Sequence, residues 1–469
     1  MKLKTITTFL YLIVSIPLFL FFRAEIFVWI SFFINYCLIT AIAYYHLNKE
    51  ALFSPFLTSY IVFVFLFFIV APIIQTNSIE STSLLFPNAY PYSAKDIIFT
   101  NFLILIFTAI FFLGYIFFKR RKLQIPKQLE SEKTSFSLPL TILVLFILCF
   151  FIWIINYEYI IDEITQSIYS TKSESISVVL IRKKILFLIP LGVIALTFRY
   201  LKEKRKITTN TLISFLILLI LLSFLIFFKN PLTEKRNALG PIYITLIYLF
   251  FPKLINTNAK FFLFSFLSMI VFFPLMSALT HIDANLSEII KNPKIVVDDF
   301  VKHGGILNTF NTLHYDAFAN IMATVEYVSR YGFSYGFQLL SALLFFVPRS
   351  LWSTKPLSTG EFIGNFLIDD FGFNYNNLSN PLVSEGYINY GLIGVIIMAI
   401  LLSYFVIKFI GWLQSSDTLK EIIAFYFSVH LIFLLRGDFT NGLAYFVGTF
   451  IGVYIIPKVL IKYIKVRKD

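Results

Sequence analysis

Two positively charged residues lie between two prolines in the stretch FFVPRSLWSTKP, residues 345–356. The cations are Arg349 and Lys355, and the stretch follows the apolar run LLSALL. Pro348 and Pro356 restrict the chain on both sides, because a proline ring fixes one backbone angle. A guanidinium can hold two phosphate oxygens at once, and an ammonium adds a point charge. The pattern therefore indicates a loop that binds phosphate groups.

A simpler interpretation of Arg349 stays open. Its long side chain could extend from an apolar segment to lipid headgroups, or it could pair with Asp369 or Asp370. Trp352 suits the same depth, since tryptophan is common at membrane interfaces. Both interpretations place the stretch at a membrane surface.

Further cations stand near the ends of predicted helices: Lys229, Arg236 and Arg436. Arg236 begins a predicted helix in the run KRNALGPIY. A cation at that position opposes the helix dipole, so we expect Arg236 to have another role. Together with Arg349 and Lys355, the residues Arg236 and Arg436 are our candidates for binding phosphate groups.

Four side chains are candidates for a general base that removes a hydroxyl proton: Asp316, Glu326, Glu385 and His314. His314 and Asp316 lie at the start of a predicted helix, where an acid also serves as an N-terminal cap. Glu385 lies in NPLVSEGYINYGLIG, just before a predicted spanning helix, with no obvious partner nearby in the sequence. Glu385, Asp316 and His314 are therefore the candidate catalytic residues.

Metal-binding patterns are weak. The acidic pairs Asp298–Asp299 and Asp369–Asp370 could bind a divalent cation, but such pairs in outer loops usually form a solvated face. The two cysteines, Cys37 and Cys149, fall inside predicted helices, and the histidines do not follow a metal-ligand spacing. We expect no metal site. The chain also lacks a Gly-rich phosphate loop, so we expect no cofactor.

The composition indicates an all-α polytopic membrane protein. Hydrophobic residues make up 58% of the 469 residues and charged residues 14%, against about 25% charged in a soluble domain. The mean hydropathy is +0.81. Apolar stretches, most of them near the ~20 residues that a spanning helix needs, predict about twelve transmembrane helices. These stretches are 4–22, 25–46, 52–74, 97–118, 138–157, 184–201, 210–228, 238–252, 260–280, 387–408, 421–436 and 440–458.

The basic residues predict the orientation. With a cytoplasmic N-terminus and twelve alternating helices, 23 of the 39 Lys and Arg lie on the cytoplasmic side, as the positive-inside rule favours. Both termini are then cytoplasmic. The first stretch carries no small-residue cleavage site and is expected to stay as a helix. The net charge of +13 therefore orients the chain in a bilayer and does not indicate nucleic-acid binding.

The chain divides into three regions. Residues 1–280 hold nine predicted transmembrane helices with short loops, and residues 387–469 hold three more and a basic tail. Between them, residues 281–386 form a long outer loop, and loops of that length are usually functional. Within it, 314–332 has the apolar spacing of an amphipathic helix. Residues 337–347 are too short to span and are expected to be re-entrant or interfacial.

The chain resembles the bacterial O-antigen and capsule repeat-unit polymerases, the Wzy type. The similar features are the number of predicted helices, one very long outer loop late in the chain, Arg236 before a mid-chain helix, and the run YGFSYG…VPRSLWSTKP…SEGYINYGLIG. The resemblance covers residues 228–395 in motif and the whole chain in layout. The residues that it assigns to the site are Arg236, Pro348, Arg349, Lys355, Pro356 and Glu385, with His314 and Asp316 as further candidates.

The resemblance implies a metal-independent membrane glycosyltransferase of the bacterial cytoplasmic membrane. The growing glycan would leave undecaprenyl pyrophosphate and join a hydroxyl of the next lipid-linked repeat unit, on the outer face. The partners it implies are undecaprenyl-pyrophosphate-linked oligosaccharides, the lipid bilayer, a chain-length regulator and a flippase, without nucleic acid. Preplaced cations would stabilise the leaving pyrophosphate.

Two other classes remain open. A flippase for the same lipid-linked units should carry charged residues along a path through its helices, whereas here the polar residues concentrate in the outer loops. An O-antigen ligase would share the fold and the cations. A dolichol-type sugar transferase usually keeps an acidic pair in its first outer loop, and here that loop holds only Glu25.

Overall fold

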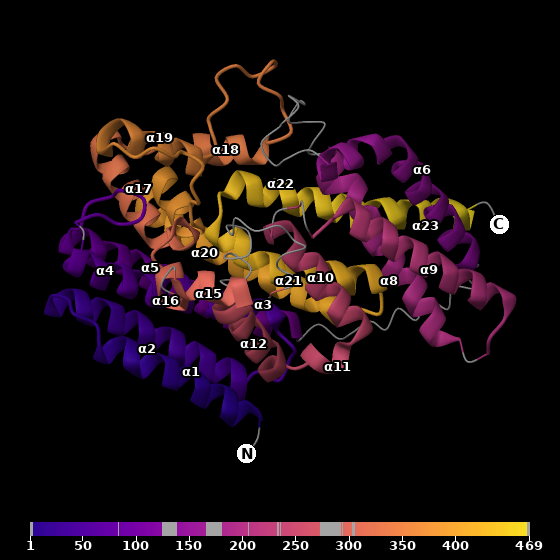
Figure 1. Cartoon of the computed structure of the whole chain (residues 1–469), viewed down its shortest axis with the longest axis horizontal. Helices are drawn as coiled ribbons and strands as arrows, with labels where there is room; N and C mark the ends of the chain where they lie inside the picture. The colour runs from indigo at the N-terminus through magenta and orange to yellow at the C-terminus, as the bar shows by residue number, and fades with distance from the viewer. Residues whose placement is uncertain are drawn as a thin grey trace.

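Every regular element of the computed structural model is a helix, within the part of the chain that it describes (Figure 1). That part comprises residues 3–82, 84–123, 138–165, 181–204, 206–231, 234, 236–272, 292, 294–302 and 305–466. Residues 273–291, which include the end of the predicted ninth helix and the start of the predicted outer loop, therefore lie outside the described residues. The prediction of an all-α protein is confirmed over the described part.

The helices before residue 273 are mostly long and apolar, and a later group of short helices lies between residues 294 and 371. The elements before the late group are α1 (Leu3–Leu20), α2 (Ile26–Asn48), α3 (Pro55–Phe65), η1 (Leu66–Val70), α4 (Ala71–Thr82), α5 (Ala94–Leu123), α6 (Leu138–Thr165), η2 (Ile181–Ile185), η3 (Leu186–Leu188), α8 (Ile189–Glu203), α9 (Thr209–Phe228), α10 (Arg236–Phe250), α11 (Pro252–Ile255), α12 (Asn258–Leu267) and η4 (Ser268–Phe272). The late group and the last long helices are α15 (Lys294–Lys302), α16 (Gly305–Thr309), η5 (Leu313–Tyr315), α17 (Ala317–Tyr331), α18 (Phe337–Leu343), α19 (Thr359–Phe371), α20 (Leu382–Leu413), α21 (Thr418–Arg436), α22 (Phe439–Thr449), η6 (Phe450–Ile455) and α23 (Ile456–Val466).

Ten helices of the described part are long and apolar enough to cross a membrane. Twelve were expected, and the difference lies at 238–252 and 260–280. The described residues of these stretches form shorter apolar helices, Asn237–Phe250 and Asn258–Val271, and residues 273–280 of the second stretch lie outside the described part. Pro252 follows α10 and begins the next short helix, and a proline cannot continue the hydrogen-bond ladder of the helix before it. The chain is a multi-pass membrane protein by the length and composition of its helices.

One continuous helix forms the centre of the bundle. It runs through α3, η1 and α4, and 94% of its most apolar window is buried by other helices. Helices α2, α12 and α21 pack against α3. At the buried centre, Tyr60 donates a hydrogen bond to Thr108 at 3.0 Å. The other long helices therefore surround a helix that has almost no free surface.

Helix α20 contains a sharp break. Tyr390 and Gly391 leave the helical conformation, with φ/ψ of −145°/22° and 58°/−140°. The positive φ at Gly391 is a conformation that favours glycine. Across the break the two helical pieces touch, since a Cβ built on Gly394 would lie 1.9 Å from the carbonyl oxygen of Gly386. The expected boundary at residue 386–387 thus falls inside the first helical piece, which begins at Leu382.

The late group of helices α17–α19 lies at one side of the bundle, away from the N-terminus (Figure 1). Helix α17 falls within the expected 314–332 and ends at Tyr331, and its C-cap is Gly332, whose φ is 84°. The expected amphipathic character differs, because both faces of its first half are buried. Helix α18 occupies the expected 337–347 and stops at Leu343. Its exposed apolar side chains are Phe337, Leu340 and Leu343.

We predict that Gly394→Ala destabilises the protein and that Gly411→Ala does not. Both glycines lie in α20, but an added Cβ at Gly411 meets nothing within 4 Å. The methyl group at 394 would strike the backbone of Gly386, and overpacking typically costs about 1–3 kcal/mol. The thermal unfolding midpoint of the purified protein in detergent is the measurement. Equal midpoints for the two variants would contradict the close contact across the break.

Candidate functional site at the α21–α22 connection

The connection between α21 and α22 consists of two residues, Gly437 and Asp438. Asp438 is buried, and its carboxylate accepts hydrogen bonds from the backbone N–H of Asn441 at 3.0 Å and of Gly360 at 2.8 Å. It therefore caps the start of α22 and also holds the start of α19. Burial raises the pKa of Asp438, and the backbone hydrogen bonds oppose that rise. The first N–H groups of a helix lack internal partners, so one carboxylate serves two helices.

Glu385 reaches the same two helix starts from α20. Its side chain is 1% exposed. It accepts a hydrogen bond from the Thr359 hydroxyl at 2.9 Å and another from the Phe439 N–H at 3.1 Å. Thr359 and Phe439 are the first residues of α19 and α22. The positive ends of two helix dipoles thus face two buried carboxyl groups.

Asp316 and Arg436 form an ion pair on the other side of the connection. Arg436 Nη2 lies 3.5 Å from Asp316 Oδ1 and donates to the Leu313 carbonyl at 2.9 Å. The Ser379 hydroxyl donates to the same Asp316 oxygen at 2.6 Å. Asp316 is 1% exposed, whereas the Arg436 side chain is 26% exposed. Burial raises the pKa of Asp316 despite the opposing charge of Arg436.

The side chain of Asp316 does not cap α17. The residue stands at the N-cap position, but it makes no side-chain cap hydrogen bond. The interpretation of Asp316 as a side-chain cap is therefore wrong, and its carboxylate contacts Arg436 and Ser379 instead. The preference of an aspartate for a helix start is local, whereas Ser379 and Arg436 come from distant parts of the chain.

The sequence analysis did not predict the polar network that lies behind Asp316. Asn320 Nδ2 donates to the Ser379 carbonyl at 2.6 Å, and Asn88 Nδ2 donates to Asn320 Oδ1 at 2.8 Å. One turn further, the Thr324 hydroxyl donates to Asn380 Oδ1 at 3.2 Å. The available signal was the row of Asp316, Asn320 and Thr324 at helical spacing, because buried polar side chains need partners.

Arg349 and Lys355 lie apart from these carboxylates, in the loop after α18. The Lys355 ammonium donates to the carbonyls of Leu344, Phe345 and Val347 at 2.9–3.0 Å. The exposed Arg349 guanidinium donates to the carbonyls of Lys355 and Pro356. Burial, and then the charge of Arg349, lower the pKa of Lys355. Both cations thus hold their own loop together, and Lys355 also satisfies the end of α18.

The loop with Arg349 leads directly into the site. Pro356 is followed after two residues by Thr359 and Gly360, which contact the two carboxylates at the connection. Gly360 and Gly364 have no side chain, and this lets the backbone of residues 376–379 lie against α19. Ser379 in that segment contacts Asp316. A few residues therefore join the cationic loop to both halves of the site.

Arg236 is the first residue of α10, which packs on α21. Gly240 lies against Phe433, and Tyr248 stacks on Phe425 with ring centroids 3.9 Å apart. The two helices are therefore antiparallel, with one residue of α10 matched to one of α21. The side chain of Arg236 lies outside the described part of the chain.

The structure thus brings together Asp316, Glu385 and Arg436 around the connection, whereas no contact of Arg236 with these residues is found in the described part of the chain. His314 lies half-buried in η5, two residues before Asp316. Asp438, Thr359 and Ser379 are site residues that the sequence analysis did not propose. The D-x-x-N pattern of Asp438 and Asn441 is a capping signal that could have identified the first of them.

Over the described residues, no group of three His, Cys, Asp or Glu side chains is placed to hold a metal ion. The fold and this arrangement define a polytopic helical membrane protein with a polar site at one end of its bundle. Searches against protein-family models, curated proteins and solved structures find no match to the chain.

We predict that Arg436→Ala lowers the stability of the protein by about 1–3 kcal/mol. The value lies between the ~0–1 kcal/mol of a surface pair and the ~3–5 kcal/mol of a broken buried pair, because Arg436 is partly exposed. Adding Asp316→Asn should recover much of the loss, since asparagine needs no counter-charge. Thermal unfolding in detergent measures both.

Arg330→Ala is the matched control for this cycle. Arg330 pairs with Glu326 and Asp370, but its side chain is 43% exposed, so its loss should lower the unfolding midpoint much less than the loss of Arg436. A double variant no more stable than Arg436→Ala alone would mean that the buried charge of Asp316 is not what Arg436 compensates.

Proposed function

We propose that the chain is a polymerase that joins undecaprenyl-pyrophosphate-linked repeat units into O-antigen or capsular polysaccharide. The observation that carries the proposal is the meeting of Arg436 with buried carboxylates at one connection, which is linked to the loop of Arg349. A transferase that releases pyrophosphate needs cations where charge develops. The motif resemblance over residues 228–395 supports the same assignment.

The proposed reaction exchanges one glycosidic bond for another. A sugar hydroxyl of the acceptor repeat unit attacks the first sugar carbon of the growing glycan, and the bond from that carbon to the pyrophosphate oxygen breaks. The hydroxyl proton passes to a base, and the pyrophosphate leaves with its negative charge. The balance requires no oxidant, nucleotide or metal.

In this proposal the cations and the acids have different roles. Arg436 is partly exposed and its buried Nε has no acceptor among the described residues, so it is the first candidate to contact pyrophosphate, with Arg236 and Arg349. Glu385 and Asp316 are buried and we assign them a positioning role at the connection. Among the three candidate catalytic residues Glu385, Asp316 and His314, only His314 keeps accessible surface, which makes it the candidate base.

We further propose about twelve membrane crossings, with α10 and α12 completing the ten longer spans, and a site on the outer face of the bacterial cytoplasmic membrane. At the opposite side, Lys119 near the end of α5 pairs with Glu50 at 2.6 Å, and Tyr248 near the end of α10 donates to Glu421 at 2.9 Å. Both termini would be cytoplasmic.

A topology reporter tests this orientation. A fusion placed in the exposed turn after Tyr331 should report the outer side, and one placed after Lys462 should report the cytoplasm. Alkaline phosphatase and a fluorescent protein are each fused at both positions, so that the two reporters give opposite signals on the two sides of the membrane. A cytoplasmic signal from the first fusion would move the site to the wrong side for lipid-linked polymerisation and exclude the proposal.

The function is tested on the surface polysaccharide of cells that carry variants of this chain. Arg436→Ala and Arg349→Ala should each reduce the polymer ladder at least about tenfold and leave a single repeat unit on its acceptor, because each loses a charge that stabilises the transition state. Lys302→Ala, an exposed cation in α15, is the control and should keep the ladder. Gel electrophoresis and immunoblotting measure polymer and protein level together.

The same gel separates the alternatives. Full ladders from both arginine variants at normal protein level would refute the phosphate role. Lipid-linked units that accumulate inside the cell, with none outside, would indicate a flippase. A normal ladder that stays on the carrier lipid would indicate a ligase. In the described structure the buried Lys184 and Lys229 lie at helix ends, which favours surface chemistry over a path through the bundle.

A further inference from the structure

A groove at the end of the bundle opposite the candidate site is lined by apolar and basic side chains together. It has a volume of about 680 Å³ and is formed by the end of α8, the start of α9, the end of α10 and α11. Its apolar lining includes Phe198, Phe215 and Leu218. The basic lining is Lys202 and Lys253. A volume of this size suits a bound small molecule or part of a lipid.

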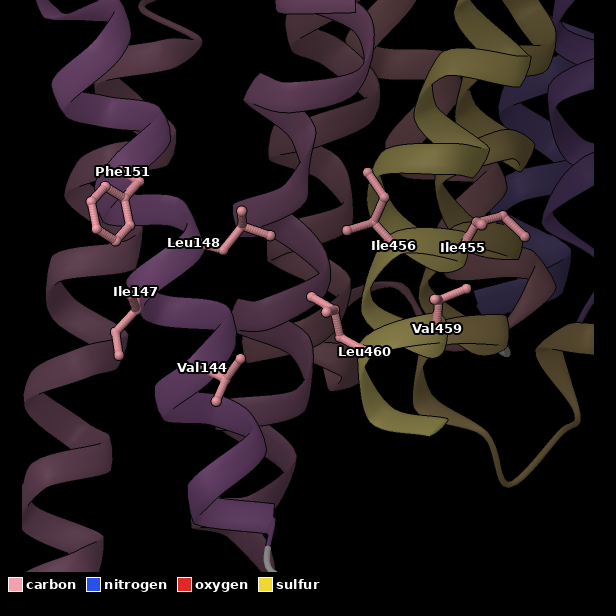
Figure 2. Close-up of a pocket in the computed structure, with 8 residues that line it drawn as sticks. All are labelled: Val144, Ile147, Leu148, Phe151, Ile455, Ile456, Val459 and Leu460. Atoms are coloured by element: carbon pink, nitrogen blue, oxygen red, sulfur yellow. The ribbon is translucent and has the colours of Figure 1, made fainter. Parts of the chain in front are cut away.

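A second groove provides a contrast. It lies between α6 and the run from η6 to α23, and Figure 2 shows its lining side chains. All eight are apolar, among them Leu148, Phe151 and Leu460. Such a surface fits the hydrocarbon of any membrane lipid and selects none. The basic residues of the first groove are therefore what distinguishes it.

The lysines of the first groove are available for an anion. Both are exposed, and no ion pair to either is found among the described residues. The neighbouring Glu203 pairs with Arg199 at 3.0 Å. The ammonium of Lys260 donates to the carbonyl of Lys253 and adds a third positive charge nearby. The edge of the groove thus keeps an uncompensated positive charge.

The depth of the groove fits a lipid at the membrane surface. Lys202 lies next to the end of α8 and Lys253 in α11, where the chain leaves the apolar helices. Phe215 and Leu218 lie two to three turns inside α9, at the depth of acyl chains. Basic pockets between helices at a membrane surface bind anionic headgroups. The charged residues thus lie at the edge of the groove and the apolar residues in its interior, in the same order as the headgroup and the acyl chains of a phospholipid.

We propose that this groove binds one anionic phospholipid, with its phosphate between Lys202 and Lys253 and an acyl chain along α9. The site is separate from the connection of α21 and α22, and it stands whether or not the chain is a polymerase. The ligand is a lipid because a free phosphate would use only the edge of the groove. Each lysine should strengthen binding by about fivefold, since one basic residue near a membrane surface contributes ~1 kcal/mol.

Native mass spectrometry of the purified full-length protein in detergent tests the proposal. Phosphatidylglycerol and phosphatidylcholine with the same acyl chains are titrated, and the fraction of protein that retains lipid is measured. The wild-type chain should retain phosphatidylglycerol at least about tenfold more strongly. The double variant Lys202→Ala/Lys253→Ala should lose about tenfold or more of that affinity.

Matched controls make the loss specific. Lys49→Ala/Lys408→Ala removes two other exposed lysines near helix ends and should change the affinity by less than about twofold. Lys202→Gln/Lys253→Gln keeps the length of the side chains and should behave like the alanine pair. Size-exclusion profiles and unfolding midpoints of all variants verify that they are folded.

Three results would overturn the proposal. One is equal retention of the two lipids by the wild-type chain. Another is retention of phosphatidylglycerol by both lysine-pair variants at the wild-type level. The third is displacement of the lipid by millimolar inorganic phosphate or by dihexanoyl phosphatidylglycerol as effectively as by the long-chain lipid, because the acyl chain would then contribute nothing.

Discussion

Two buried carboxylates, Glu385 and Asp438, face the first residues of α19 and α22 and take their hydrogen bonds from them. A buried charge is costly unless donors surround it, so each carboxylate depends on segments that it does not belong to. If α19 moved away, Asp438 would lose its bond from Gly360 and Glu385 its bond from Thr359. The rest of the site depends on these hydrogen bonds, because they hold the connection that follows Arg436.

The same requirement links a loop to a membrane helix. Glu385 lies on the short helical piece before the break in α20, and the close contact of Gly386 with Gly394 fixes where that piece lies. From there the side chain reaches the start of α19, three residues after Pro356. The backbone of the loop with Arg349 is thus tied to the bundle by a carboxylate and by a glycine contact.

The sequence predicts the helical membrane class well, because long apolar runs have few other uses. It is less informative where a residue has both a local and a distant use. Asp316 reads as a helix cap from its neighbours, but it pairs with Arg436, which is 120 positions later. Lys355 reads as a phosphate ligand, but its ammonium holds three carbonyls of its own loop. Local spacing cannot reveal such contacts, since they depend on which segments the fold brings together.

The enclosed position of α3 has a consequence for how the protein is made. Chains are synthesised from the N-terminus, so α3 enters the bilayer long before α12 and α21 exist to cover it. Its apolar surface is then in contact with lipid tails, and exchanging those tails for other helices brings no hydrophobic gain. The late helices must therefore be held by shape and by a few polar contacts, such as the bond from Asn258 to the carbonyl of Leu52 just before α3, at 2.9 Å. The surface at the centre of the mature bundle thus contacts lipid during biosynthesis, until helices more than 200 residues later in the chain are made.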